Sequence, residues 1–175
     1  ILIGSDPRAA PELGQSLWLD VCYDRREGMP PKVDLAAERK HGDFVRRIID
    51  LGLVTAVHDV SDGGVLVAVT EMALAGGIGA TLQAPLFEDQ VDREKLQHAW
   101  SLFAENQARY VVTEPFNTDH VEMLAKEAGV SCCYIGWTGG EGIAVGTHEK
   151  TLYGEVPLSA LREASESFFR DWMEG

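Results

Sequence analysis

Apolar positions along the chain alternate between short strand-like runs and longer stretches with helical spacing. Asp34 caps a predicted helix that ends near Gly52, and residues 55–57 then form a short strand-like run. Residues 65–75 are almost continuously apolar and predict a buried helix that two glycines close. Because strands and helices alternate in this way, the pattern predicts an α/β layered domain, of the α+β kind, with a mixed β-sheet and packed helices.

The same alternation continues toward the C-terminus. Strands are expected at residues 78–82 and 108–113, and helices at residues 92–103 and 121–128, the last ending at Gly129. Other expected elements are a strand within residues 13–20, a hairpin of residues 132–137 and 142–147, and a helix from Pro157. The apolar faces expected to point inward comprise Leu35, Ala36, Phe44, Val45, Ile48, Ile49, Leu51, Leu96, Trp100, Phe103, Leu161, Ala164, Phe168, Phe169 and Trp172.

Length and charge narrow the class of protein. The 175 residues are 45% hydrophobic, enough to bury one core, so a single domain over residues 1–175 is expected. The absence of an initiator methionine suggests a fragment of a longer protein. The net charge of −13 argues against nucleic-acid or anionic-membrane surfaces, and no apolar run reaches the length of a membrane span. Cys22, Cys132 and Cys133 are expected to be reduced, mostly buried thiols in a cytoplasmic protein.

The most distinctive polar segment, residues 58–64, joins a predicted strand to the buried helix, and we call it the first junction. Free N–H groups at a helix start favour anions, and Gly63 and Gly64 carry no side chain that would keep a phosphate away. The carboxylates of Asp59 and Asp62 suit a hard divalent cation that a nucleotide phosphate could share. This pattern favours a phosphate or metal site.

A purely structural role explains the same segment equally well. Ser61 or Asp62 could simply cap the helix, and the glycines could simply allow tight packing of helix on strand. Local sequence leaves both interpretations open.

A second polar segment, residues 103–109, links the helix expected at 92–103 to the next strand, and we call it the second junction. Glu105, Asn106 and Gln107 offer donors and acceptors for a polar ligand or a metal-bound water, although a solvated helix end would look similar. If both junctions lie at one end of the sheet, their side chains converge on a common cleft within reach of one small ligand.

These two segments carry a resemblance to a known family. The string from Val57 to Gly64, followed by Glu71-Met72-Ala73 and Ala75-Gly76, and the string from Leu102 to Arg109 resemble the C-terminal domain of phosphoribosylformylglycinamidine synthase, small-type synthetase subunit. Residues 135–137 and the terminal helix are similar to that family too, so the likeness covers essentially the whole chain. It implies the C-terminal-domain fold of the superfamily related to aminoimidazole ribonucleotide synthase.

The resemblance also implies an activity. Such synthases are ligases of purine biosynthesis that use ATP and Mg²⁺ to activate a phosphorylated ribonucleotide, formylglycinamide ribonucleotide, for amination to the amidine. Ammonia comes from a glutaminase subunit, and a small accessory subunit completes the complex. The partners implied for this chain are therefore those subunits, the substrate and the remaining domains of its own polypeptide, with no nucleic acid or membrane.

Individual residues carry over from the family by position. The resemblance implies that Asp59 is a metal ligand and that Glu105, Asn106 and Gln107 contact substrate. Together with the local pattern of the first junction, it predicts a substrate- or nucleotide-binding site made of Asp59, Ser61, Asp62, Gly63, Gly64, Glu105, Asn106 and Gln107. Asn106 departs from the serine of the family's string, and the chain resembles the second, auxiliary copy of the domain. No catalytic residue is therefore assigned, and the isolated chain is expected to be inactive.

Two questions stay open on sequence alone. Arg109 could be a surface residue or could pair with Glu105. A stand-alone small-molecule or nucleotide-binding domain of the same superfamily is the alternative function.

Overall fold

The computed structural model describes residues 1–5, 12–83, 102–115, 119–146 and 151–174, and its chain divides into two compact units. Unit 1 comprises Ile1–Val69 and Pro85–Tyr134, and unit 2 comprises Thr70–Ala84 and Ile135–Gly175. Most of the helix expected at residues 92–103 lies outside the described residues, and only its last two positions are seen as helical. The expectation of a single domain stays a prediction.

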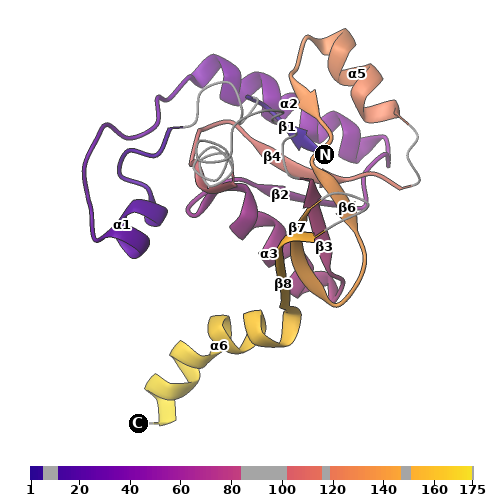
Figure 1. Cartoon of the computed structure of the whole chain (residues 1–175). Coiled ribbons are helices and arrows are strands. Elements are labelled where there is room, and N and C mark those ends of the chain that lie inside the picture. Colours follow the sequence, from indigo (N-terminus) through magenta and orange to yellow (C-terminus); the bar gives the residue numbers. More distant parts are fainter. Residues whose placement is uncertain (6–11, 84–101, 116–118, 147–150, 175) are drawn as a thin grey trace. The chain divides into compact units, whose positions relative to one another are not determined.

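Unit 1 is built on an antiparallel sheet of four strands in the order β2-β4-β1-β5 (Figure 1). The strands are β1 (Leu2–Ile3), β2 (Ala56–Asp59), β4 (Tyr110–Thr113) and β5 (Cys132–Cys133). Asp59 pairs with Tyr110, so the last residue of β2 lies opposite the first residue of β4. The strands predicted at 55–57 and 108–113 are thereby confirmed, and both junctions leave the sheet at the same end.

Helices α2 (Leu35–Asp50) and α5 (His120–Ala128) pack with this sheet around the core of unit 1. Asp34 caps α2 by accepting the N–H groups of Ala36 and Ala37, both at 3.0 Å, as predicted. The buried core residues are Ile3, Phe44, Val45, Ile48, Val112, Val121, Ala125 and Val130. Leu35, Ala36, Ile49 and Leu51 of the expected inward face are instead exposed, because the buried stripe of α2 is narrower than its apolar content suggests.

The strand expected within residues 13–20 is wrong, because helix α1 (Leu17–Tyr23) begins there. Ser16 caps α1, its Oγ accepting the N–H of Leu19 at 3.3 Å. Trp18 of α1 meets Tyr23 edge to face at a centroid distance of 4.8 Å and stacks on Phe103 at 6.1 Å. A helix brings the two aromatic rings of α1 together, which an extended strand of the same residues would not do.

Helix α3 (Gly64–Gly76) follows the first junction as predicted, and its second half belongs to unit 2. The sheet of unit 2 has the order β6-β3-β7-β8, with strands β3 (Ala80–Gln83), β6 (Gly136–Thr138), β7 (Gly142–Gly146) and β8 (Thr151–Pro157). Only β3 and β7 pair in parallel among these described neighbours, so this sheet is mixed.

The predicted hairpin of residues 132–137 and 142–147 is wrong in two respects. Cys132 and Cys133 belong to the sheet of unit 1, and β3 lies between β6 and β7. The turn that was expected to close the hairpin instead forms hydrogen bonds with Gly79, the residue before β3. The N–H of Gly139 donates to the carbonyl of Gly79 at 2.7 Å, and the N–H of Gly79 donates to Gly140 at 3.0 Å. Strand β3 therefore pairs with both β6 and β7, which were expected to pair with each other.

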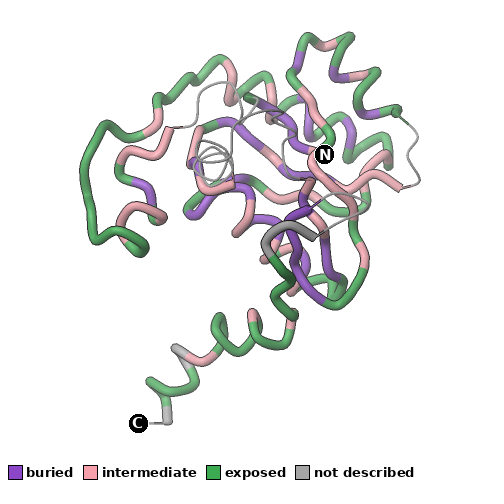
Figure 2. Tube along the Cα trace, viewed as in Figure 1, coloured by how far each residue is buried: buried purple, intermediate pink, exposed green. Residues whose placement is uncertain are grey.

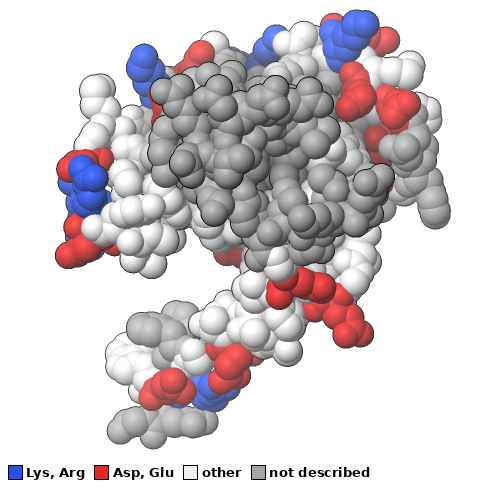
Figure 3. All heavy atoms as spheres, viewed as in Figure 1, with Lys and Arg blue, Asp and Glu red and all other residues white. Residues whose placement is uncertain are grey.

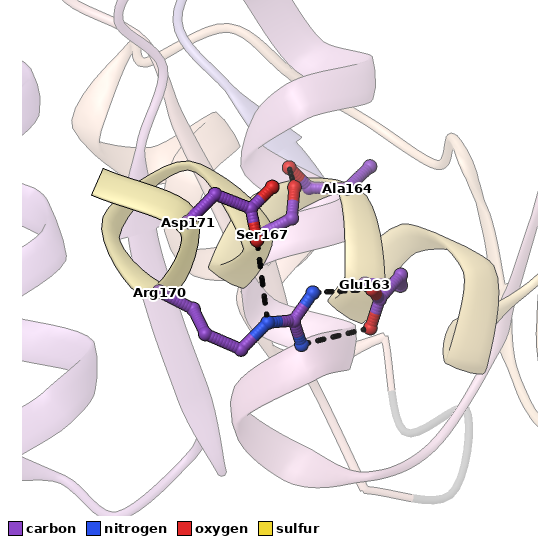
Figure 4. Close-up of polar contacts among 5 residues, drawn as sticks. All are labelled: Glu163, Ala164, Ser167, Arg170 and Asp171. Carbon is purple, nitrogen blue, oxygen red and sulfur yellow. Dashed lines mark hydrogen bonds and ion pairs between the residues drawn. The ribbon is translucent and has the colours of Figure 1, made fainter. Parts of the chain in front are cut away.

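Helix α6 (Leu158–Glu174) follows β8 and confirms the predicted terminal helix, but not its inward face. Ala164 and Trp172 are exposed, Leu161 is half-buried, and the side chains of Phe168 and Phe169 lie outside the described ones. Figure 2 shows most of this helix as exposed. Acidic side chains lie beside a basic one on its surface (Figure 3). Arg170 lies between Glu163, 2.5 Å away, and Asp171, 3.6 Å away (Figure 4), in an exposed group of the kind that contributes little to stability.

The three cysteines are free thiols, as expected, but they are not mostly buried. Cys22 is exposed, whereas Cys132 and Cys133 are half-buried in β5. Burial raises the pKa of Cys132 to about 12, which keeps that thiol protonated at neutral pH. Within the described part of the chain, no helix combines the length and apolar character that a membrane span requires.

Candidate functional site

The two junctions meet at one end of the sheet of unit 1, as predicted. Because β2 and β4 are antiparallel, the chain leaves β2 where it enters β4, and the N–H of Val60 still donates to the carbonyl of Arg109 at 2.9 Å. Beyond that bond, the N–H of Gly63 donates to Oε1 of Glu105 at 2.8 Å. The first and second junctions are therefore in direct hydrogen-bonded contact.

Gly63 and Gly64 bring the start of α3 against the backbone of the second junction. Both glycines have positive φ angles, +79° and +72°. A β-carbon on Gly64 would lie 2.7 Å from the carbonyl oxygens of both Leu102 and Ala104. A β-carbon on Gly63 would lie 2.4 Å from the side chain of Val67. The two glycines thus have the structural role that the sequence allowed, because they permit close packing in a left-handed conformation.

The carboxylate of Glu105 lies at the N–H of Gly63, where the sequence predicted that an anion could bind. One oxygen of its carboxylate accepts two backbone N–H groups, those of Gly63 and Leu17, both at 2.8 Å. Carboxylates are favourable at helix starts for the same electrostatic reason as phosphates. A phosphate approaching the N–H of Gly63 would have to compete with this carboxylate of the same sign.

Asn106 connects the second junction to Glu12, a residue that sequence reasoning missed. The N–H of Glu12 donates to Oδ1 of Asn106 at 3.1 Å, and Nδ2 of Asn106 lies 3.5 Å from Oε2 of Glu12. That carboxylate also accepts the N–H of Lys32 at 3.1 Å. Glu12 stands 94 positions before Asn106, and no local pattern marks it as a partner.

Arg109 is buried inside the second junction, which corrects both sequence-based expectations for it. Its side chain is 1% exposed and is not on the surface. Its described hydrogen bonds go to carbonyl groups rather than to Glu105: Nε donates to Asn106 at 3.0 Å, and Nη2 donates to Ala104. Burial lowers the pKa of Arg109 to about 10, so the guanidinium stays protonated at neutral pH. Arg109 thus fixes the backbone on both sides of Glu105.

His41 supports the same loop from α2. Its Nδ1 lies 2.7 Å from the carbonyl oxygen of Ala108, whose φ angle of +59° is unusual for a residue other than glycine. Sequence reasoning gave His41 no role, because its partner is 67 positions away.

The remaining candidate side chains face solvent. Asp59, Ser61, Asp62 and Gln107 are exposed. The carboxylate of Asp59 lies 3.6 Å from Nδ1 of His58. The same nitrogen lies 2.6 Å from the backbone carbonyl oxygen of Asp59. These exposed groups are the ones that a ligand could reach without disturbing the hydrogen bonds of Glu105 and Asn106.

The carboxylates of the first junction suit a magnesium ion only if a phosphate supplies further oxygen ligands. Among the residues that the structure describes, no group of three or more His, Cys, Asp or Glu side chains is arranged to hold a metal ion. Magnesium in nucleotide enzymes is commonly held by one or two carboxylates together with phosphate oxygens and water. Asp59, with Asp62 close by in sequence, matches that mode and does not form a cage.

The family of this chain follows from its sequence. Residues 1–148 match the family described as AIR synthase related protein, C-terminal domain, and the chain belongs to that family. The phosphoribosylformylglycinamidine synthase subunit PurL of Rhodopseudomonas palustris (strain TIE-1) is 49% identical over 164 residues, 93% of this chain and 21% of that protein. The corresponding subunit of Agrobacterium fabrum is 40% identical over 176 residues, 100% of this chain and 21% of that protein. The chain spans about a fifth of the length of these relatives.

Solved structures share the fold. Thermotoga maritima PurL complexed with ATP matches 91% of this chain and 24% of its own, with a TM-score of 0.62 and 23% identity. The same protein complexed with FGAR matches 74% of this chain and 21% of its own, with a TM-score of 0.58 and 27% identity. These structures confirm the α/β fold class predicted from the sequence. The family match of residues 1–148 and the 49% identical relative confirm the predicted family resemblance.

Proposed function

We propose that this chain is the C-terminal domain of a phosphoribosylformylglycinamidine synthase, a cytoplasmic ligase of purine biosynthesis. The observation that carries the proposal is the 49% identity to a PurL subunit over 93% of the chain. The full-length enzyme would use ATP and Mg²⁺ to convert formylglycinamide ribonucleotide and glutamine-derived ammonia to the amidine. Its partners would be a glutaminase subunit and a small accessory subunit, together with the other domains of the same polypeptide.

Within that enzyme, the two junctions would form one wall of a nucleotide or substrate site. The exposed groups Asp59, Ser61, Asp62 and Gln107 are available to phosphate, ribose or a bound metal ion. Gly63, Gly64, Glu105 and Asn106 would give the wall its shape, which their mutual packing and hydrogen bonds support. Magnesium, when bound, would reduce the repulsion between the negative charges of phosphate and carboxylate.

The isolated 175 residues should fold and yet show no turnover, whereas the full-length protein should form the amidine. Phosphoryl transfer needs groups placed on opposite sides of the phosphate, and this chain spans only about a fifth of its relatives. Product formation from ATP, ammonia and formylglycinamide ribonucleotide would be measured for both proteins. An inactive full-length protein would refute the proposed activity, and amidine formation by the isolated chain would refute its dependence on other domains.

Replacing Asp59 by asparagine in the full-length protein should weaken Mg²⁺ binding in the presence of ATP by about tenfold, since one anionic ligand is lost. Titration calorimetry with Mg²⁺ at fixed ATP measures the change. Asp50→Asn serves as the matched control, because Asp50 is an exposed acid at the end of α2 and outside both junctions. Equal Mg²⁺ affinity of the two variants would remove Asp59 from the metal site.

A further inference from the structure

Two backbone segments that are far apart in sequence meet at one oxygen atom of Glu105. Oε1 accepts the N–H of Leu17, 88 positions earlier, and the N–H of Gly63, 42 positions earlier. Leu17 is the first residue of α1, and Gly63 immediately precedes α3. N–H groups at helix starts have no partner within their own helix, so both donors depend on a group from elsewhere.

The segment of residues 12–32, which we call the arm, belongs to unit 1 and is attached to the rest of that unit through the second junction. Its contacts there include the N–H of Leu17 on Glu105, the N–H of Glu12 on Asn106, and the ring of Trp18 on Phe103. The backbone N–H of Glu105 also lies 3.4 Å from the carbonyl oxygen of Glu12. The second junction therefore holds the arm at both ends of a short stretch, residues 12 to 18.

The arm itself contributes little apolar burial to the unit. Val21 is 74% exposed and Met29 is 79% exposed, and Leu17 and Tyr23 are also exposed. A segment with few buried apolar contacts opens at low free-energy cost, so the polar attachments of the arm, together with the Trp18–Phe103 stack, determine its position. Glu105 is the attachment that the arm shares with the first junction.

We infer that Glu105 is a positioning residue that couples the arm to the first junction, so that both are held or released together. When the carboxylate leaves its place, Leu17 and Gly63 lose their acceptor in the same event. The start of α1 then loses its attachment to the second junction, and the N–H of Gly63 becomes open to solvent. This inference concerns a conformational device within unit 1 and does not depend on the synthase activity proposed above.

Hydrogen–deuterium exchange of the full-length protein tests the coupling. Glu105→Ala should accelerate exchange about tenfold in peptides that cover Leu17 and in those that cover Gly63, the factor expected when an N–H loses a charged acceptor. Peptides from α5 should exchange as in the wild-type protein, which reports that the core of unit 1 is intact. Gln107→Ala is the matched control, because Gln107 is an exposed neighbour in the same junction and should leave both peptides unchanged.

Two conservative variants separate the effect of side-chain length from the effect of negative charge. Glu105→Gln keeps the length of the side chain and an acceptor oxygen, and it should preserve most of the protection at both peptides. Glu105→Asp keeps the charge but withdraws the carboxylate by one methylene, and it should lose protection at both. These two variants also decide the matter if Glu105→Ala unfolds the unit and α5 exchanges faster as well.

Three results would overturn the inference. Acceleration at only one of the two peptides would show that the arm and the first junction are not coupled through Glu105. Unchanged exchange at both would show that Glu105 holds neither. Better protection by aspartate than by glutamine would show that negative charge near the helix starts matters, and not a shared acceptor at a fixed reach.

Discussion

Replacing Gly64 by alanine is expected to lower the free energy of unfolding by roughly 2 to 5 kcal/mol. The new β-carbon would stand 2.7 Å from two backbone carbonyl oxygens, those of Leu102 and Ala104, so no side-chain rotation can relieve the overlap. Overpacking of this kind costs about 1 to 3 kcal/mol, and a non-glycine residue in the left-handed region costs about 1 to 2 kcal/mol. Urea unfolding of the 175-residue chain, followed by circular dichroism, measures the loss.

Gly52→Ala provides the matched control for that experiment. Gly52 has a φ angle of +66°, similar to the +72° of Gly64, but a β-carbon there would meet nothing within 4 Å. The control therefore isolates the backbone cost of about 1 to 2 kcal/mol from the steric one. If both variants lose the same stability, the close approach between the start of α3 and the second junction is not a source of stability.

The contacts of Gly64 bear on how such glycine motifs are interpreted. From sequence, glycines at a helix start favour phosphate binding and close packing equally. In this chain, Gly64 is already required by the backbone of residues 102–104, and the N–H of Gly63 already has an acceptor in Glu105. The structural role of the two glycines is thus visible without a ligand. Any ligand role rests on the exposed side chains of the first junction.

Local signals in the sequence were sufficient for the helices that have their own starts and stops. Asp34 caps α2, and Gly129, with a φ angle of +62°, ends α5, because both effects act within one helical turn. The meeting of the two junctions was also predictable in outline, since it needs only that β2 and β4 be antiparallel neighbours.

Partners distant in sequence account for what could not be predicted. Residues 136–138 and 142–146 have the spacing of a hairpin, yet both pair with β3, because a third strand satisfies more backbone groups than the local turn does. Residues 13–20 alternate weakly, and the helical outcome depends on Ser16 as a cap and on Phe103 as a stacking surface. Glu12 and Leu17 gain their roles from Glu105 and Asn106, which no window around either residue contains.

Arg109→Ala is expected to destabilise the chain by roughly 1 to 8 kcal/mol, although it removes a buried charge. Two carbonyl groups, those of Ala104 and Asn106, would lose their donor, at about 1 to 3 kcal/mol each. The cavity left by a fully buried side chain adds about 2 to 5 kcal/mol. The lowering of the pKa of Arg109 from 12.5 to about 10 corresponds to roughly 3 kcal/mol that the variant recovers. The losses exceed the recovered desolvation energy.

Arg109→Met separates these contributions, because methionine refills most of the volume while it also removes the charge and its donors. Its expected loss is at most about 3 kcal/mol, since the cavity cost disappears and the recovered desolvation offsets much of the carbonyl cost. Urea unfolding of both variants and of the wild-type chain measures the order of their free energies of unfolding. Wild-type or higher stability of Arg109→Ala would mean that the buried guanidinium strains the fold, and its hydrogen bonds to the loop around Glu105 would then have to serve positioning alone.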